Sequence, residues 1–184
     1  MKLPGFTIIE LLVVIAVITI LPVIVFSNFP QVKLQFALNR AAYTFLQEAR
    51  KAQDLSLSGV AYKDSFGIEQ PVAGYGIYLN TASATNKKYI LYADRFPGNH
   101  QYDPSDYIIE TVDIDATEPG VMIESLGNVF GGKTSIDFSS PNANVSINQL
   151  DKNANNVEVI FGLESDASKT KSVLVHISGL IEIQ

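Results

Sequence analysis

The hydrophobic and polar positions divide the chain into three stretches of different periodicity. In the first stretch no charged side chain occurs between Glu10 and Lys33, and the run from Leu11 to Leu21 is almost wholly apolar. At about 1.5 Å per residue, a helix over residues 11–32 would extend roughly 33 Å, enough for a bilayer core of roughly 30 Å. The pattern predicts a membrane-inserted helix in preference to a buried core helix. A cleaved secretory signal is also disfavoured, because no small-residue cleavage site follows the apolar run.

The second stretch is amphipathic. Apolar residues recur in steps of three and four at positions 34, 38, 42, 45, 49 and 52, the period of an α-helix with one buried face. Ser58 and Gly59 form a typical helix end. We therefore expect an amphipathic helix over residues 33–58, continuous with the apolar one. Pro22 and Pro30 predict a kink or a locally melted turn, because proline lacks an N–H and clashes with the preceding turn.

The third stretch, residues 60–184, favours a β-rich globular head domain. Short runs alternate apolar with polar residues and are separated by Gly, Pro, Asn and Asp, which is typical of antiparallel strands. The predicted strands cover residues 75–79, 89–92, 107–114, 121–124, 135–138, 145–148, 157–161, 172–177 and 180–183. The fold class is therefore predicted to be α+β, with a long N-terminal helix, half membrane-inserted and half amphipathic, packed on a C-terminal antiparallel sheet domain.

Composition excludes several function classes. The 184 residues include 13 basic and 19 acidic side chains, for a formal net charge of −6, and no cysteine. The negative charge makes a nucleic-acid-coating role unfavourable. The absence of cysteine excludes disulfides, a thiol nucleophile and thiolate zinc sites. The two histidines, His100 and His176, are isolated in sequence and make neither a catalytic triad nor a zinc motif, so we expect no enzymatic activity.

One loop carries candidate metal ligands. Asp94, Asn99, Asp103 and Asp106 are oxygen donors at short spacing in a turn-rich segment between two predicted strands. Hard oxygen ligands of this kind could hold Ca²⁺, although the spacing is not that of an EF-hand and Arg95 lies among them. The same residue types also populate ordinary turns, so both interpretations stay open.

The residues before the apolar run are unusual for a simple anchor. Pro4 and Gly5 form a non-helical junction where a peptidase could bind extended backbone. Glu10 then places a carboxylate inside an otherwise uncharged segment, where burial costs several kcal/mol unless the group is paired or protonated. A glutamate close enough to the membrane surface to reach water is the simpler alternative.

These N-terminal residues resemble the class III signal of type IV pilins and type II secretion pseudopilins: a basic residue, then Gly5, Phe6, Thr7 and Glu10 leading into an apolar run. The resemblance implies a leader of residues 1–5, cleavage between Gly5 and Phe6 by a prepilin peptidase, and methylation of the new Phe6 amine. It also implies that residues 6–32 form the transmembrane or filament-core helix. Glu10 would pair with the Phe6 ammonium of a neighbouring subunit and set the axial register.

The C-terminal runs add to the resemblance. Residues 136–141, 157–161, 169–175 and 178–183 are similar to the tail of GspH-like minor pilins and pseudopilins. Two features depart from the family: its usual helix proline falls at the position of Ser27 here, and the paired cysteines of many pilin C-terminal loops are missing.

Two function classes follow. The first is a structural subunit of a type IV pilus or type II secretion-like filament, with other pilin subunits, a prepilin peptidase, an inner-membrane assembly platform and, before assembly, membrane lipid as partners. The second is a membrane-tethered, non-polymerising surface module whose sheet binds a ligand or calcium. In both, Lys2 predicts a single-pass membrane protein with a cytoplasmic N-terminus and an exported head, which the first class then places in an extracellular or periplasmic filament.

Overall fold

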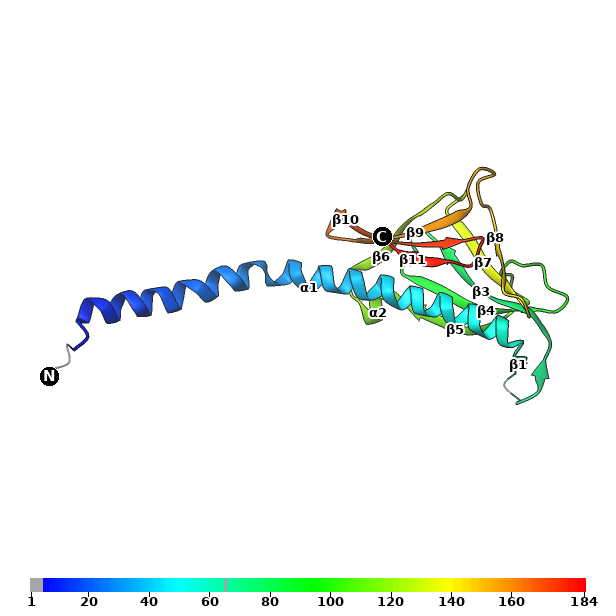
Figure 1. Cartoon of the computed structure of the whole chain (residues 1–184), viewed down its shortest axis with the longest axis horizontal. Helices are drawn as coiled ribbons and strands as arrows, with labels where there is room; N and C mark the ends of the chain where they lie inside the picture. The colour runs from blue at the N-terminus through cyan, green and yellow to red at the C-terminus, as the bar shows by residue number, and fades with distance from the viewer. Residues whose placement is uncertain (1–4, 65) are drawn as a thin grey trace. The chain divides into compact units, whose positions relative to one another are not determined.

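The computed structural model describes residues 5–64 and 66–184, and of residues 23–28 the backbone alone. Residues 1–4 of the expected leader therefore lie outside the described residues. A long helix is followed by antiparallel strands, so the α+β class fits broadly (Figure 1). The chain divides into two compact units, Met1–Phe36 and Ala37–Gln184.

Helix α1 (Ile8–Ser58) ends where the sequence predicts. Gly59 adopts a φ of 59°, and its N–H donates to the carbonyl of Ser56 at 3.1 Å, a left-handed turn that closes the helix. We expected a kink or a locally melted turn at Pro22 and Pro30. The α-helix runs through both prolines, so the melted turn is wrong. Each proline removes only one backbone hydrogen bond, and the turns on either side stay helical.

The expected membrane half of the fold is also wrong. Over the part of the chain that the structure describes, no helix has both the length and the apolar character needed to cross a membrane. The transmembrane assignment of residues 6–32 and the single-pass membrane location are corrected accordingly.

The strands of the second unit form two main sheets, both antiparallel, and a small hairpin. The five-stranded sheet has the order β5 (Tyr107–Asp113), β4 (Lys88–Arg95), β3 (Val72–Asn80), β7 (Lys133–Ser139), β8 (Asn144–Ile147). The four-stranded sheet has the order β11 (Ile181–Ile183), β10 (Asp166–His176), β9 (Asn156–Leu163), β6 (Val121–Gly127). The hairpin pairs β1 (Tyr62–Lys63) with β2 (Glu69–Gln70), and a short helix α2 (Ile114–Thr117) follows β5. Every predicted strand coincides with one of these, which confirms the alternation pattern.

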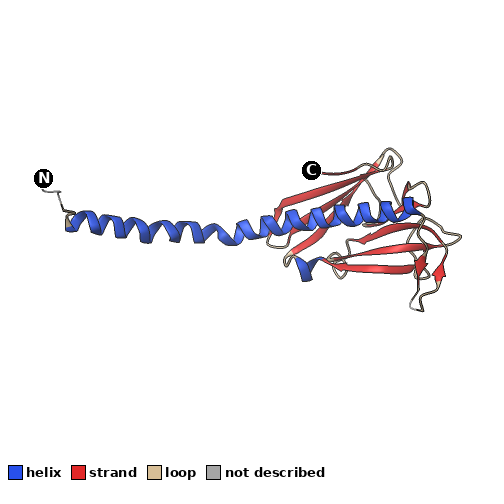
Figure 2. Ribbon diagram, turned by 60° about the horizontal axis from the view of Figure 1, so that its bottom comes forward, coloured by secondary structure: helices blue, strands red, loops and turns tan. Residues whose placement is uncertain are grey.

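The predicted apolar stripe of the helix lies in the core of the second unit. Its members from position 38 to position 52 are buried. The ring of Phe45 packs edge-on against Tyr89 of β4, with centroids 5.4 Å apart, and against Phe161 of β9 at 5.6 Å. The residues 37–58 of α1 thus contact both main sheets (Figure 2). This helix covers one face of the five-stranded sheet, and loops lie over the other face.

Candidate functional site

The candidate site lies on the face of the five-stranded sheet that points away from α1. Side chains alternate along β3, with Ile77 in the core and Gly74, Gly76 and Tyr78 on the opposite face. The strand register places Gly76 between Tyr92 of β4 and Asp137 of β7. It likewise places Gly74 between Asp94 and Ser139. Two acidic side chains therefore stand on either side of a strand that has no side chain to separate them.

Glycine is required at position 76 because groups of the two neighbouring strands lie very close to its backbone. A Cβ atom at this position would lie 2.6 Å from the Tyr92 hydroxyl and 2.6 Å from the carbonyl oxygen of Ile136. The missing side chain lets the Tyr92 ring lie across β3, so that its hydroxyl reaches Asp137 Oδ2 at 3.4 Å.

The loop over residues 96–106 folds over the same face. Gly98 adopts a φ of 73°, and a Cβ atom there would lie 2.8 Å from Asp94 Oδ2, so the tight turn needs glycine. The backbone N–H of His100 donates to Asp94 Oδ2 at 2.9 Å, and the N–H of Tyr102 donates to Ser135 Oγ at 2.9 Å. These bonds attach the loop to β4 and to β7.

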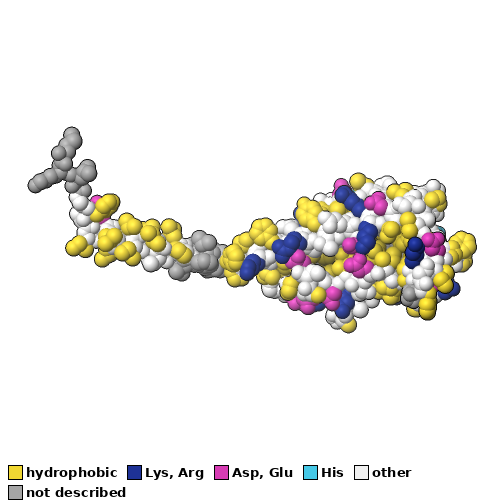
Figure 3. Space-filling model, turned by 90° about the horizontal axis from the view of Figure 1, so that it is seen from below, with side chains coloured by type: hydrophobic (Ala, Val, Ile, Leu, Met, Phe, Trp, Pro, Cys, Tyr) yellow, Lys and Arg dark blue, Asp and Glu magenta, His cyan; other side chains and the backbone are white. Residues whose placement is uncertain are grey.

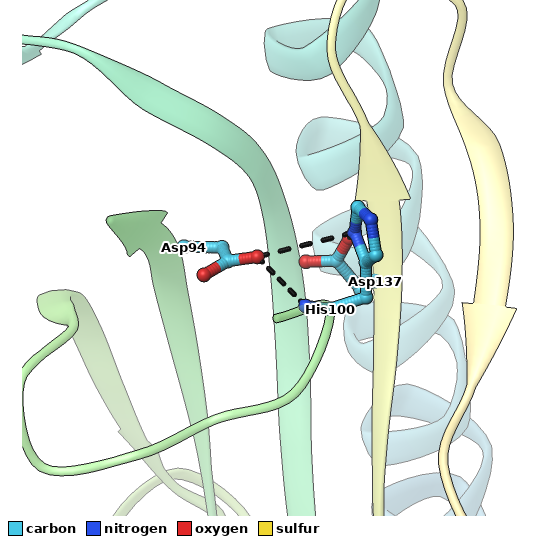
Figure 4. Close-up of side chains that lie close together, drawn as sticks. All are labelled: Asp94, His100 and Asp137. Carbon is cyan, nitrogen blue, oxygen red and sulfur yellow. Dashed lines mark hydrogen bonds and ion pairs between the residues drawn. The ribbon is translucent and has the colours of Figure 1, made fainter. Parts of the chain in front are cut away.

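The loop brings His100 onto the two acidic side chains. His100 Nδ1 lies 3.1 Å from Asp137 Oδ1 and 3.9 Å from Asp94 Oδ2 (Figure 4). Both carboxylates are buried, with side-chain exposures of 2% for Asp94 and 0% for Asp137, whereas the imidazole is 46% exposed. The cluster is therefore a pair of buried acids covered by one base that solvent can reach.

Burial dominates the electrostatics of this cluster. It raises the pKa of Asp137 from 3.8 to about 6, the hydrogen bond from His100 acts in the opposite direction, and the negative charge of Asp94 adds to the rise. Burial also raises the pKa of Tyr92, with the charge of Asp137 as the second cause. Tyr92 therefore stays a neutral hydroxyl beside the carboxylate.

The cluster does not have the geometry of a catalytic triad. Ser139 Oγ lies 3.3 Å from His100 Nδ1, the same nitrogen that faces Asp137. A triad needs the serine and the carboxylate on opposite ring nitrogens, so that one orients the ring while the other exchanges a proton. Ser139 and Asp137 instead share one nitrogen, and a relay between them through the ring has no path.

The same three side chains could hold a metal ion. One ligand atom from each of Asp94, His100 and Asp137 lies within 4.8 Å of the other two. In a tetrahedral site with bonds of about 2.0–2.1 Å, ligand atoms lie roughly 3.4 Å apart, close to the observed 3.1 Å and 3.9 Å. One imidazole with two carboxylates suits Zn²⁺ or Mn²⁺ better than Ca²⁺, which prefers oxygen alone.

The four predicted calcium ligands lie around one cavity. Asp94, Asn99, Asp103 and Asp106 all line a hollow of about 350 Å³. However, their side chains already form hydrogen bonds within the loop. Asp106 accepts the N–H groups of Arg95 at 3.0 Å and Asp103 at 2.8 Å, and Asp103 accepts the Asn99 amide at 3.0 Å. Bonds from Ser105 lower the pKa of Asp103, whereas burial raises that of Asp106. These contacts are those of a turn-forming loop.

Sequence reasoning did not connect His100 with Asp94 and missed Asp137. Asp137 stands between the apolar Ile136 and Phe138 in a predicted strand, where alternation allows a polar residue, and no local pattern marks it as a ligand. The one usable signal is the pair Gly74 and Gly76 in β3, because glycine inside a strand often marks a close approach of other groups.

The N-terminal candidates lie in the first unit. Gly5 and Phe6 precede the helix and are exposed. Thr7 and Glu10 form a capping box: Glu10 Oε2 accepts the Thr7 N–H and hydroxyl, each at 2.8 Å, and Thr7 Oγ1 accepts the Glu10 N–H at 3.3 Å. The Thr7 N–H is the main cause of a lowered pKa for Glu10. Glu10 thus has a local role in starting the helix, which the spacing of Thr7 and Glu10 could have predicted.

Comparisons with protein-family models, with curated proteins and with solved structures found no match for this chain.

Proposed function

We propose that this chain is a structural subunit of a type IV pilus or type II secretion-like filament. In this proposal a prepilin peptidase cuts between Gly5 and Phe6, the new Phe6 amine is methylated, and the helix that follows packs against the same helix of other subunits. The observation that carries the proposal is the exposure of apolar side chains along residues 6–21.

These side chains form a continuous apolar surface. Phe6 and Ile8 are 88% and 86% exposed, and large exposed apolar side chains continue to Leu21. Figure 3 shows them as yellow atoms along the N-terminal part of the helix. An exposed apolar surface of this extent is characteristic of a contact with another apolar surface, because its removal from water is favourable.

The apolar surface surrounds the helix. Leu11, Leu12, Val13, Val14 and Ile15 are consecutive and are between 47% and 64% exposed. Successive residues point about 100° apart around a helix, so these five together cover every side of it. A helix that is apolar all round needs neighbours on all sides. A bundle of identical helices in a filament core supplies them, whereas a single groove on another protein covers one side only.

Glu10 is the only charge between Gly5 and Lys33. In the uncut chain its carboxylate is satisfied by Thr7. Cleavage creates an ammonium group on Phe6, four residues before Glu10. In a dry filament core that ammonium group needs an anion, and Glu10 of the same or an adjacent subunit supplies one.

Processing and assembly test the proposal together. The chain is expressed with a prepilin peptidase and a filament assembly system, its N-terminus is identified by mass spectrometry, and its amount in sheared filaments is measured. We expect an N-terminus at methylated Phe6 and incorporation into filaments. An intact Met1, or a processed chain that never enters filaments, would contradict the proposal.

Two variants separate the charge of Glu10 from its capping role. Glu10→Gln can still complete a capping box but cannot balance an ammonium group. Thr7→Ala removes the cap and keeps the charge. We expect Glu10→Gln to block incorporation and Thr7→Ala to reduce it only slightly. The reverse order would assign Glu10 to helix capping alone.

A second candidate function, divalent-cation binding by the head, is favoured by the convergence of Asp94, His100 and Asp137. We propose Zn²⁺ for this cluster. The alternative is Ca²⁺ held by the oxygen atoms of Asp94, Asn99, Asp103 and Asp106. The zinc assignment is favoured because the His100 imidazole supplies a nitrogen ligand 3.1 Å from Asp137 Oδ1. Nitrogen is a common ligand of Zn²⁺, whereas Ca²⁺ prefers oxygen.

Thermal unfolding of the metal-free full chain distinguishes the two ions, since a ligand of the folded state raises the melting temperature. We expect Zn²⁺ to raise it and His100→Ala to abolish the effect, while His176→Ala, the matched histidine control, retains it. A rise with Ca²⁺ that Asp103→Asn removes would favour the calcium site instead. No rise with either ion would remove this candidate function.

A further inference from the structure

A second cavity lies on the same face of the five-stranded sheet, next to the cluster of Asp94, His100 and Asp137. It has a volume of about 340 Å³ and is lined by Tyr78 of β3, the loop residues Gln101, Tyr102 and Asp103, Lys133 at the start of β7, and Asn148 after β8. This volume is at the lower end of the roughly 300–1,000 Å³ found for small-molecule sites. It suits a ligand of about one ring.

Two tyrosines form an aromatic wall of the cavity. The rings of Tyr78 and Tyr102 lie 4.8 Å apart at an angle of 31°. Tyr102 also packs edge-on against the buried Tyr92, with centroids 5.4 Å apart, and its backbone N–H donates to Ser135 Oγ at 2.9 Å. Packing from both sides therefore fixes the position of Tyr102 before any ligand binds, which lowers the entropic cost of binding.

Amide groups form the polar part of the lining. The Asn148 amide nitrogen donates to Gln101 Oε1 at 2.8 Å and joins the loop to the end of β8. This bond leaves the Asn148 amide oxygen and the Gln101 amide nitrogen with no hydrogen-bond partner among the described residues, one acceptor and one donor side by side. Lys133 also makes no ion pair within the described part of the chain.

This combination of groups selects among ligand classes. A purely apolar ligand would leave the amides unpaired, which is costly. A phosphate or polyanion would meet one lysine opposed by the carboxylate of Asp103. A saccharide ring suits both parts, because its C–H face packs on an aromatic ring and its hydroxyls both donate and accept hydrogen bonds.

We propose that this cavity binds a neutral saccharide, with one sugar ring packed against Tyr78 and Tyr102 and its hydroxyls bonded to Gln101 and Asn148. The site differs from the Asp94–His100–Asp137 cluster and needs no metal ion. It also goes beyond filament assembly, because none of its residues lies in the N-terminal segment.

Saturation-transfer difference NMR on the full chain tests the proposal, because the method detects weak ligands of large or associating proteins. Glucose, galactose, mannose and N-acetylglucosamine are the probes, glycerol is the non-ring control, and a chelator is present throughout. We expect signals from the ring C–H protons of at least one sugar, with a millimolar dissociation constant, and none from glycerol.

Variants locate the binding. Tyr102→Ala and Gln101→Ala should each weaken binding, by about tenfold for the aromatic side chain. Gln101 is exposed, so its variant keeps the test valid if Tyr102→Ala disturbs the loop. Tyr43→Ala, at an exposed tyrosine on α1, is the matched control and should bind normally. No signal from any sugar, or signals that persist unchanged in both cavity variants, would overturn the proposal.

Discussion

Asp137 shows how one strand accommodates a buried carboxylate. Its neighbours Ile136 and Phe138 are fully buried, and the Asp137 side chain is itself 0% exposed. The groups that face it are His100 from the loop, Tyr92 and Asp94 from β4, and the empty position of Gly76 on β3. A buried charge without such partners would cost several kcal/mol, so the loop and the strand stabilise each other.

The raised pKa of Asp137 predicts a pH dependence of stability in metal-free protein. Since the folded-state value of about 6 exceeds the ordinary 3.8, the folded chain holds this proton more tightly than the unfolded chain. The resulting stabilisation is complete below about pH 4 and is lost as pH rises through about 6, by an amount on the order of 3 kcal/mol.

Urea unfolding from pH 4 to pH 8 with a chelator checks this prediction. Asp137→Asn, which cannot ionise, should lose less unfolding free energy over this range than the unaltered chain. Parallel pH profiles for the two proteins would show that Asp137 does not carry the effect.

Gly76→Ala is the second prediction at this scale. The new methyl group would meet both the Tyr92 hydroxyl and the backbone oxygen of Ile136 at 2.6 Å. The tyrosine could shift but the neighbouring strand could not, so we expect a loss of about 1–3 kcal/mol of unfolding free energy. Gly5→Ala is the control, because a methyl group there meets nothing within 4 Å. Equal unfolding free energies for the two variants would show that Tyr92 and Ile136 do not lie this close to Gly76.

At the scale of the elements, the end of α1 is fixed to the five-stranded sheet by Ser56. This buried hydroxyl donates to the carbonyl of Phe138 on β7 at 2.6 Å and accepts the N–H of Tyr75 on β3 at 3.0 Å. One side chain thus joins the helix to two adjacent strands. Phe45 performs a comparable role in apolar contacts, since its ring touches both Tyr89 and Phe161.

Ser56→Ala should therefore destabilise the fold. It leaves the Tyr75 N–H and the Phe138 carbonyl in a buried place without their partner, at a cost of about 1–3 kcal/mol. Ser58→Ala, two residues later, removes an exposed hydroxyl that bonds only within the helix, and should cost less than about 0.5 kcal/mol. Chemical denaturation of both variants measures the difference, and similar losses would show that the contact to the sheet contributes little.

At the scale of the whole molecule, the chain consists of two units that differ in how many of their hydrophobic side chains are buried. All the buried hydrophobic side chains of the described residues lie at position 37 or later. The second unit therefore has its own core between the helix and two sheets. In the first unit, most of the described large apolar side chains are exposed, and in the proposed filament other subunits cover them.

Removal of residues 1–36 tests this division. The remaining chain keeps every buried apolar side chain of the described residues, so we expect its β-sheet circular dichroism to persist and its melting temperature to change by only a few degrees. It should also lose the self-association that we expect of the chain beginning at Phe6, as measured by sedimentation. Unfolding of the shortened chain, or association that survives the truncation, would contradict the prediction.

Much of the secondary structure could be predicted because it depends on short-range patterns. The buried stripe around Phe45 and the strands of both sheets follow from periods of 3.6 and 2 residues, and the helix end follows from the stop signal of Ser58 and Gly59. The membrane assignment of residues 6–32 was wrong. Over the described residues, no helix has both the length and the apolar character needed to cross a membrane.

The sequence by itself determined where the helix ends, which of its faces is buried, and that Asn99, Asp103 and Asp106 share one turn-rich loop. Asp94, predicted in the same loop, instead lies on β4. Only the tertiary structure decided that Asp137, 37 residues after His100, completes a cluster with it and Asp94. The physical reason is strand order. Antiparallel pairing places β4 and β7 on either side of β3, and no local pattern contains that register.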